Sequence, residues 1–373
     1  MSVQGAPGYI NTASNRSPDA PVDPTERSGG PDRTLRRTRP DPIGPFISRG
    51  RPPPGVYLLE LAGEDDAFAV REAESRCSAV DLVAPGIATA RGVEAPEALA
   101  YTRRICRLVG TCAPDVGAAS ALARTAGRDR TGSIAVRARD VRGLAGIDTQ
   151  AVERRLGRCL VDRGFDVDLE TPDHTLLALF SSGLAALGWL ETEPEREFAA
   201  RKPTKKPFFQ PGSMAPTDAR ALANVAGAAP GARILDPMCG TGGILVEAGL
   251  AGASVVGVDA QAKMVRGTRR NLAAYLEGGS VLRGDATRLP LADDSVDGAV
   301  LDAPYGRQSK VAGGTLSELV GGTLSELRRV APRAVLVGDR VWSDAAEAAG
   351  WTVADRFDRR VHASLTRYVH VLE

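Results

Sequence analysis

The C-terminal half of the sequence predicts an α/β fold built on a doubly wound parallel sheet. Three observations support this prediction. Strand-like and helix-like segments alternate after residue 211, a glycine-rich turn follows the first of these strands, and acidic residues stand at the ends of successive strands. Such alternation gives parallel strands with helices on both faces. At 373 residues, the chain is long enough for two or three domains.

The first 55 residues form a separate compositional segment. They hold eleven of the 25 prolines and almost no apolar run. Such a segment cannot bury enough surface to offset its ordering entropy. We expect a disordered tail, or residues added by a start codon assigned too early.

The middle of the chain predicts mixed α and β structure. Residues 56–61 and 133–138 have strand patterns, with a short strand near 79–83 and helices near 68–75 and 95–108. A helix capped by Asp148 is expected to run to residue 160 and to expose Arg154, Arg155 and Arg158. The uncharged run 174–190 is shorter than a bilayer span, so we interpret it as a core strand followed by a buried helix.

A charged linker is predicted at 191–211, acidic first and then basic, with Arg201, Lys205 and Lys206 as candidate RNA-binding residues. After it, strands are expected at 233–236, 254–259, 280–284, 295–302 and 334–337, and helices at 242–251, 261–277, 323–330 and 343–349. The sequence GGTLSEL occurs at 313–319 and again at 321–327. Each copy carries a capping box, so the double glycine is expected to separate two short helices.

The glycine-rich turn after the strand 233–236 narrows the class of ligand. It lacks the lysine of a phosphate-binding P-loop, and its spacing departs from the dinucleotide fingerprint. Asp236 at its mouth would repel a pyrophosphate but suits a ligand with an ammonium and a sulfonium, such as S-adenosylmethionine (SAM). The candidate cofactor-binding residues of the turn are Asp236, Cys239, Gly240, Thr241 and Gly242.

Two further acids follow the next two strands. Asp259 is placed to accept hydrogen bonds from the ribose hydroxyls, as acids do in nucleoside-binding α/β folds. Asp285 is a candidate acceptor for the adenine amine, with the Ala286 amide opposite the ring nitrogen. Three acids at the ends of successive strands predict one nucleoside site.

The fourth strand ends in Asp302-Ala303-Pro304-Tyr305. This resembles the D-P-P-Y motif of methyltransferases that act on exocyclic or amide nitrogens. A planar amine is a poor nucleophile, because its lone pair is delocalised. The Asp302 carboxylate and the carbonyl of Ala303 could accept from both N–H groups, and Tyr305 could stack on the flipped base.

Together with 306–309, 359–367, the block 207–214 and the pattern across 135–173, these motifs resemble the archaeal tRNA (guanine(10)-N2)-methyltransferase family. The resemblance covers about residues 56–373. It implies a ferredoxin-like domain (56–125), a THUMP RNA-binding domain (126–190) and a class I SAM-dependent, Rossmann-like methyltransferase domain (212–373). It further implies tRNA as substrate and, as in some relatives, a small zinc-binding activator protein. The segment 101–163 carries 13 basic and 6 acidic residues, which fits RNA binding.

Other functions stay open. The runner-up is an N2-guanine methyltransferase for another tRNA or rRNA position; a protein-glutamine or DNA-adenine methyltransferase and a non-catalytic tRNA-binding protein come after it. Three histidines and five cysteines without a C-x-x-C pair predict no metal site. A cytoplasmic monomer without membrane contact is expected. One or two methyl transfers are both compatible with the motif.

Overall fold

The computed structural model describes residues 55–194, 196–305, 315–362 and 365–373. The predicted tail up to residue 54, the motif residues 306–309 and residues 363–364 lie outside the described residues. In the described part of the chain, no helix is both long and apolar enough to cross a bilayer.

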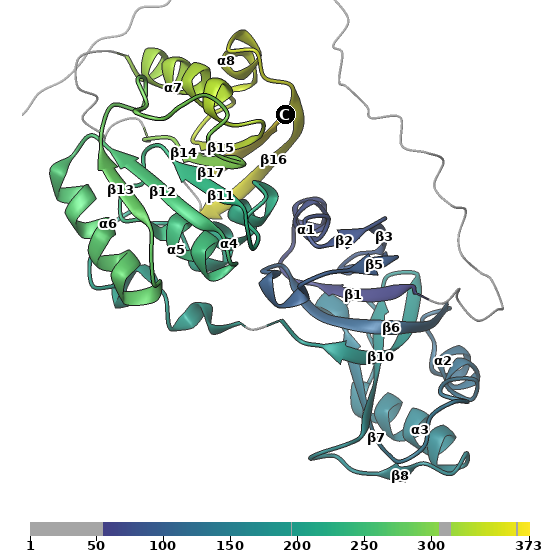
Figure 1. Ribbon diagram of the computed structural model, residues 1–373. Helices are drawn as coiled ribbons and strands as arrows, with labels where there is room; N and C mark the ends of the chain where they lie inside the picture. Colours follow the sequence, from purple (N-terminus) through teal and green to yellow (C-terminus); the bar gives the residue numbers. More distant parts are fainter. Residues whose placement is uncertain (1–54, 195, 306–314, 363–364) are drawn as a thin grey trace, which may run out of the picture. The chain divides into compact units, whose positions relative to one another are not determined.

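Residues 57–192 contribute all strands of one eight-stranded sheet (Figure 1). In spatial order the strands are β3 (Asp81–Ala84), β4 (Ile87–Ala90), β1 (Tyr57–Leu61), β6 (Thr102–Cys112), β10 (Leu184–Thr192), β9 (His174–Ser181), β7 (Ser133–Asp140) and β8 (Asp166–Val167). The associated elements are α1 (Asp66–Ala73), α2 (Val116–Ala123), α3 (Thr149–Val161), the β2 (Cys77–Ser78) and β5 (Gly92–Val93) pair, and the short helices η1 (Pro96–Ala98) and η2 (Val141–Gly143). Because β6 pairs with β10, the sheet continues across the predicted domain boundary at 125/126.

Two predicted helices of this half are strands instead. The run 174–190 forms the hairpin of β9 and β10, because Gly183 turns the chain with a φ of +77°. The segment predicted as the helix 95–108 contains η1 and the first part of β6. Pairing of β6 with β1 on one side and with β10 on the other outweighs its local helix pattern.

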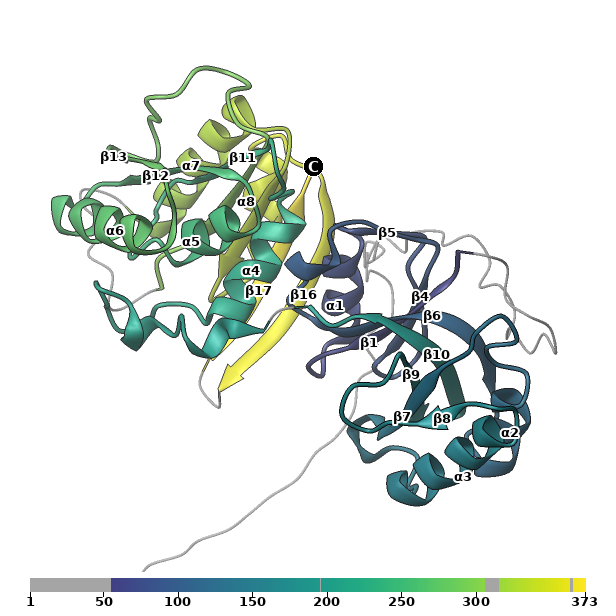
Figure 2. The ribbon, with the colours of Figure 1, turned by 60° about the horizontal axis from the view of Figure 1, so that its bottom comes forward.

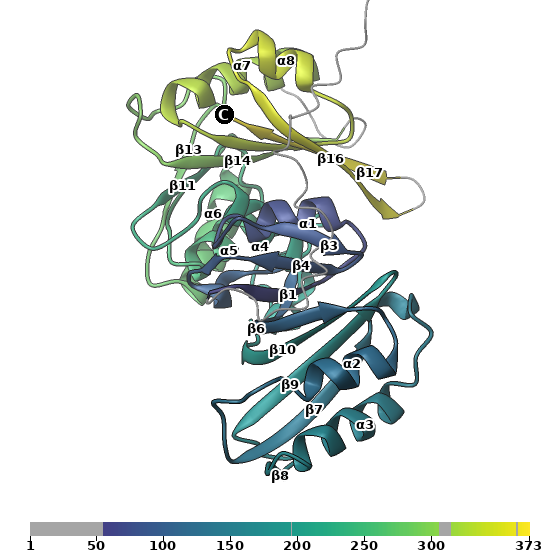
Figure 3. The same ribbon diagram turned by 90° about the vertical axis from the view of Figure 1, so that its right-hand side faces the viewer.

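The second sheet confirms the predicted doubly wound arrangement. Its order is β13 (Ser280–Arg283), β12 (Ser254–Asp259), β11 (Arg233–Asp236), β14 (Gly298–Asp302), β15 (Ala334–Gly338), β17 (Leu365–Leu372) and β16 (Val353–His362). The first five strands are parallel, and β17 runs antiparallel to both neighbours. Helices α4 (Pro216–Val225), α5 (Gly243–Leu250) and α6 (Ala262–Tyr275) lie on one face, and α7 (Leu316–Val330) and α8 (Ser343–Ala348) on the other (Figure 3). The order reverses between β11 and β14, which is where ligands bind in such sheets.

The described part of the GGTLSEL repeat, from Thr315 on, belongs to the single helix α7, so the prediction of two short helices is wrong. Thr315 caps α7 with a reciprocal bond to Glu318, as expected. Thr323 is buried within the helix, and its hydroxyl donates to the Leu319 carbonyl at 2.8 Å. Burial of Val320, Leu324 and Leu327 against the sheet keeps the helix continuous through its two glycines.

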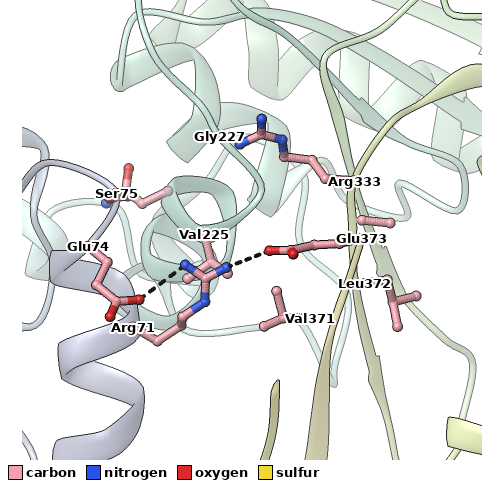
Figure 4. Close-up of a pocket in the computed structure, with 11 residues that line it drawn as sticks. Arg71, Glu74, Ser75, Val225, Gly227, Arg333, Val371, Leu372 and Glu373 are labelled. Carbon is pink, nitrogen blue, oxygen red and sulfur yellow. Dashed lines mark hydrogen bonds and ion pairs between the residues drawn. The ribbon is translucent and has the colours of Figure 1, made fainter. Parts of the chain in front are cut away.

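Helix α1 of the first sheet packs against α4 of the second, beside β16 (Figure 2). The buried Glu72 carboxylate accepts from the Tyr101 amide at 3.1 Å and from the Asn224 side chain at 2.6 Å. At the rim of this contact, Arg71 pairs with Asp355 at 3.0 Å. Arg71 also pairs with Glu373 at 3.3 Å (Figure 4). A buried polar contact therefore holds α1 on α4.

Candidate active site

The glycine-rich loop leaves the carboxyl end of β11 and enters α5. Gly240 and Gly242 have φ values of +51° and +74°, which residues with a Cβ atom rarely adopt. Two side chains of α6 support the loop from below. The Thr268 hydroxyl donates to the Gly240 carbonyl at 2.7 Å, and the Asn271 amide donates to the Thr241 carbonyl at 2.8 Å. The loop is thus fixed by polar groups that are themselves buried.

Asp236 and Asp259 lie at this edge of the sheet. Asp236 is almost completely buried, and its carboxylate accepts from the Met238 amide at 3.1 Å. Burial raises the pKa of Asp236 well above its usual range, and the nearby Asp302 and Asp259 charges raise it further. Asp259 accepts from the Gly240 amide at 3.0 Å and the Gln261 amide at 2.8 Å. It therefore ties the loop to the start of α6.

Three other predicted cofactor-binding residues differ in exposure. The Cys239 thiol is buried beside Thr268, and burial raises its pKa, so it packs as a small apolar group rather than as a nucleophile. Asp285 is exposed in the turn after β13, where bonds from the Thr287 amide and hydroxyl lower its pKa. Ala286 is buried beside it. A contact of Asp285 and Ala286 with adenine stays a prediction.

The motif 302–305 begins at the last residue of β14, the strand next to β11. The Tyr305 hydroxyl donates to Asp302 Oδ1 at 2.7 Å and accepts from Arg367 Nε at 3.1 Å. Burial raises the pKa of the Asp302 carboxyl, while the Tyr305 bond and the Arg367 charge lower it. Ala303 is buried, and its amide donates to the Val337 carbonyl at 2.9 Å. Pro304, between Ala303 and Tyr305 in the sequence, is half-buried.

The chemistry of these side chains fits SAM. Asp236, Asp259 and Asp302 are close enough for the charge of the latter two to raise the pKa of the first. A cluster of buried carboxylates is stabilised by a cation and destabilised by a phosphate. The ammonium and sulfonium of SAM supply that positive charge. Within the described residues, no group of three or more His, Cys, Asp and Glu side chains could hold a metal ion.

The six candidate RNA-binding residues fall into two groups. Arg154, Arg155 and Arg158 are exposed along α3, and Lys205 is exposed at the end of the short helix η4 (Pro203–Lys205). By contrast, Arg201 pairs with the buried Glu247 at 2.9 Å, and Lys206 is 7% exposed. Their assignment to RNA binding is therefore corrected, because both face α5 rather than solvent.

Several residues that shape the site escaped the sequence analysis. These are Thr268 and Asn271 on α6, whereas Ser213 beside Thr241 and Arg367 on β17 lie in the motif blocks 207–214 and 359–367 without a predicted role. Thr268 and Asn271 stand three residues apart on the buried face of an amphipathic helix. Polar residues on an apolar face are a usable signal, since buried polar groups need partners. Nothing in the sequence indicated that Arg367 would reach Tyr305.

Replacement of Asp259 by alanine is expected to weaken SAM binding by about 1.5–3 kcal/mol, the contribution of a charged hydrogen-bonding group. Part of the loss comes from release of the Gly240 amide that Asp259 now holds. Titration calorimetry with SAM measures the effect. Asp344→Ala on α8, exposed on the other face of the sheet, is the matched control. Unchanged affinity in Asp259→Ala would place the cofactor elsewhere.

Comparisons with known proteins agree with this geometry. Residues 203–368 match the family described as RMKL-like, methyltransferase domain. The tRNA (guanine(10)-N2)-dimethyltransferase of Methanothermobacter thermautotrophicus is 36% identical over 294 residues, which is 74% of this chain and 83% of that protein. The enzyme of the same name from Pyrococcus abyssi is 32% identical over 65% of this chain and 74% of that protein. A tRNA (guanine(6)-N2)-methyltransferase from Thermus thermophilus is 34% identical over 42% of this chain and 46% of that protein. The chain therefore belongs to the tRNA (guanine(10)-N2)-dimethyltransferase family.

Proposed function

We propose that this protein transfers methyl groups from SAM to the exocyclic N2 of a guanosine in tRNA, and that guanosine 10 is the target. The observation that carries the proposal is the Asp302–Tyr305 motif at the end of β14, beside the glycine-rich loop of β11. Family membership supports tRNA as the substrate and guanosine 10 as the methylated nucleotide.

The chain's own groups have defined tasks in this reaction. Guanine leaves its stack to enter the site, at a cost of a few kcal/mol. Asp302 and the Ala303 carbonyl accept from the two N–H groups of N2 and hold the nitrogen in a near-attack geometry. Tyr305 stacks on the base. SAM, when bound beside the glycine-rich loop, would supply an electrophilic methyl group and leave as the neutral thioether S-adenosylhomocysteine, while the proton lost from N2 would pass to solvent.

RNA binding is assigned to the exposed face of α3. Arg154, Arg155 and Arg158 lie on that face, and the ion pairs of the described residues do not include them. Phosphate contacts by such cations supply much of the affinity for nucleic acid. The exposed Lys205 and Lys202 lie outside α3, in the segment before α4.

Reversal of all three α3 arginines to glutamate should abolish retention of tRNA while SAM affinity is unchanged. The slope of log Kd against log salt is expected to fall by about one for every phosphate that the protein no longer neutralises. Filter binding at several salt concentrations measures both quantities. As a control, Arg266, Arg270 and Arg340 are exposed outside α3 and can be reversed together with the same change in charge. Equal weakening in both variants would show a general charge effect and contradict the assignment.

Mass spectrometry of nucleosides tests the function directly. Purified protein, SAM and a tRNA transcript should yield N2-methylguanosine or N2,N2-dimethylguanosine, whose ratio shows one or two transfers. A transcript with adenosine at position 10 should yield neither. Product from that transcript would favour the runner-up, an N2-guanine methyltransferase for another position, such as the relative named for guanine 6.

Three further properties belong to the proposal. A small zinc-binding activator is expected to raise activity when added, as the family resemblance implies. The protein is expected to be a monomer and to act in the cytoplasm.

A further inference from the structure

Two arginines of the C-terminal hairpin share one carboxylate. Arg359 of β16 and Arg367 of β17 stand directly opposite each other in the antiparallel ladder. Like charges in that position repel. Asp218 of α4 separates them, with Oδ1 at 3.0 Å from Arg359 Nη1 and Oδ2 at 3.6 Å from Arg367 Nη1. The arrangement fixes both guanidiniums at defined positions on the sheet face that carries α4.

From Arg367, the contacts continue into the methyltransferase motif. Arg367 is 8% exposed, and its Nε donates to the Tyr305 hydroxyl at 3.1 Å. That hydroxyl in turn donates to Asp302 Oδ1 at 2.7 Å. Arg367 therefore contacts the Tyr305 hydroxyl, whose position fixes the orientation of the Tyr305 ring. Through this hydroxyl, Arg367 also acts on the Asp302 carboxylate that should bind N2.

From Arg359, the contacts continue into the N-terminal half. Arg359 Nη2 donates to the Tyr101 hydroxyl at 2.6 Å, and that hydroxyl donates to Asp218 Oδ1 at 2.6 Å. The Arg359 guanidinium also lies 4.1 Å from the centre of the Phe68 ring on α1. Tyr101 itself is held by the bond from its amide to Glu72. A single chain of contacts thus leads from α1 to Asp302.

We propose that Arg367 is a positioning residue for Tyr305 and Asp302, and that Asp218 links its orientation to Tyr101 of the N-terminal half. The inference rests on the proposed function, since it concerns the residues that hold the target base. Its consequence is that docking of α1 on α4 prepares the methyltransferase motif for catalysis, in addition to any contact that the N-terminal half makes with RNA.

The charges around Asp302 give the proposal a pH signature. Burial raises the pKa of Asp302 and the Asp218 charge raises it further, whereas the Tyr305 hydrogen bond and the Arg367 charge lower it. Removal of the Arg367 charge leaves Asp218 less compensated, so the pKa of Asp302 rises. Because the carboxylate form is required, the acid limb of the kcat profile should then move to higher pH.

The main test is Arg367→Gln in the full chain, assayed with tRNA and SAM. We expect kcat to fall about 10- to 100-fold, as for removal of one charged hydrogen bond, with KM for both substrates unchanged and the acid limb displaced upward. Arg367→Lys keeps the charge and should restore the pH profile, but only part of kcat. Arg356→Gln is the matched control, because Arg356 is exposed on the same hairpin and pairs with Asp358 at 3.4 Å.

Two more variants test the links of the chain. Tyr101→Phe removes only the hydroxyl that contacts Asp218 and Arg359, and should lower kcat several-fold without loss of SAM or tRNA binding. In a Tyr305→Phe background, Arg367→Gln should lower kcat by a much smaller factor than in the wild type, because the shared hydroxyl is already absent. Multiplicative effects of Arg367→Gln and Tyr305→Phe, or a normal kcat in Arg367→Gln, would overturn the proposal.

A spectroscopic measurement separates this inference from the proposed function. The chain has six tyrosines, so the Tyr305 ring resonance in protein labelled with ¹³C-tyrosine can be assigned from Tyr305→Phe. Both Arg367→Gln and Tyr101→Phe should shift that resonance, and Arg356→Gln should not. If these shifts occur but wild-type protein methylates no tRNA, the proposed function is wrong and the positioning network stands. If tRNA is methylated but the resonance stays unchanged, the network is wrong.

Discussion

Asp302→Ala is expected to reduce kcat by about 10²–10³-fold, the usual loss when one preorganised polar group is removed from a reacting centre. Asp302 is the one carboxylate at the end of β14, where the motif places the target amine. As positive charge develops on N2 during methyl transfer, its attraction to the carboxylate grows. The contribution is therefore larger in the transition state than in the ground state. Affinities for SAM and tRNA should change little.

Asp302→Asn separates the charge from the hydrogen bond. Asparagine still accepts a hydrogen bond but carries no charge, so an intermediate kcat is expected. Single-turnover kinetics with saturating SAM would measure the chemical step for both variants. Near-normal turnover in Asp302→Ala would remove this residue from the mechanism and favour a non-catalytic tRNA-binding protein.

Thermal unfolding supplies the control for folding. Burial raises the pKa of Asp302 in the folded state, so the folded protein binds this proton more tightly than the unfolded chain does. The stability contributed by this group is then lost as the pH rises from the pKa of Asp302 in the unfolded chain through its higher pKa in the folded protein. Asp302→Asn should therefore have an unfolding midpoint equal to or above that of the wild type at pH 8, and the difference should shrink toward pH 4. Low activity with retained stability would identify a functional residue rather than a structural one.

The parallel sheet was the most predictable part of the fold. The ranges expected for β11 and β12 match the structure, because short apolar runs bounded by turn residues and acids have few alternative conformations. The predictions of secondary structure were wrong where pairing with strands distant in sequence determines the conformation. Residues 102–112 form a strand because β1 and β10 flank them, and 174–192 form a hairpin because Gly183 allows the turn. Neither pairing can be inferred from the local pattern.

The candidate site divides in the same way. The acids that follow β11, β12 and β14 could be located from sequence, since the carboxyl ends of parallel strands meet at one edge. The groups that orient them could not. Arg367 lies 62 residues beyond Tyr305 in the sequence, and its contact depends on the antiparallel return of β17.

The ion cluster around Glu247 explains why Arg201 and Lys206 face the protein interior, although the linker pattern predicts exposed RNA-binding side chains. Charge in a Pro-rich, Lys-rich linker usually faces solvent, and this expectation holds for Lys205. Glu247, however, stands in the apolar helix α5 (Gly243–Leu250) and is completely buried. A carboxylate in such a helix requires cationic partners, and Arg201 is one of them.

Glu247→Gln is expected to destabilise the protein by about 3–5 kcal/mol, the cost of breaking a buried ion pair from one side. Glu247 Oε1 accepts from Arg201 Nε at 2.9 Å, and Oε2 lies 3.0 Å from Arg220 Nη2. Arg220 and Lys206 are both nearly buried, and burial lowers the pKa of each while the Glu247 charge raises it. Without the carboxylate, these cations would lose the nearest charge that compensates them while staying buried.

Urea unfolding of the full chain, followed by circular dichroism, measures this effect as a lower midpoint. The matched control is Asp358→Asn, which removes the carboxylate of the exposed Arg356–Asp358 pair and should cost less than about 1 kcal/mol. Because the Glu247 cluster is shielded from solvent, its contribution should hardly change between low and high salt. A destabilisation as small as that of Asp358→Asn would mean that the three cations find water or other partners when Glu247 is neutral. The helix α5 that follows the glycine-rich loop would then not depend on this cluster for its position.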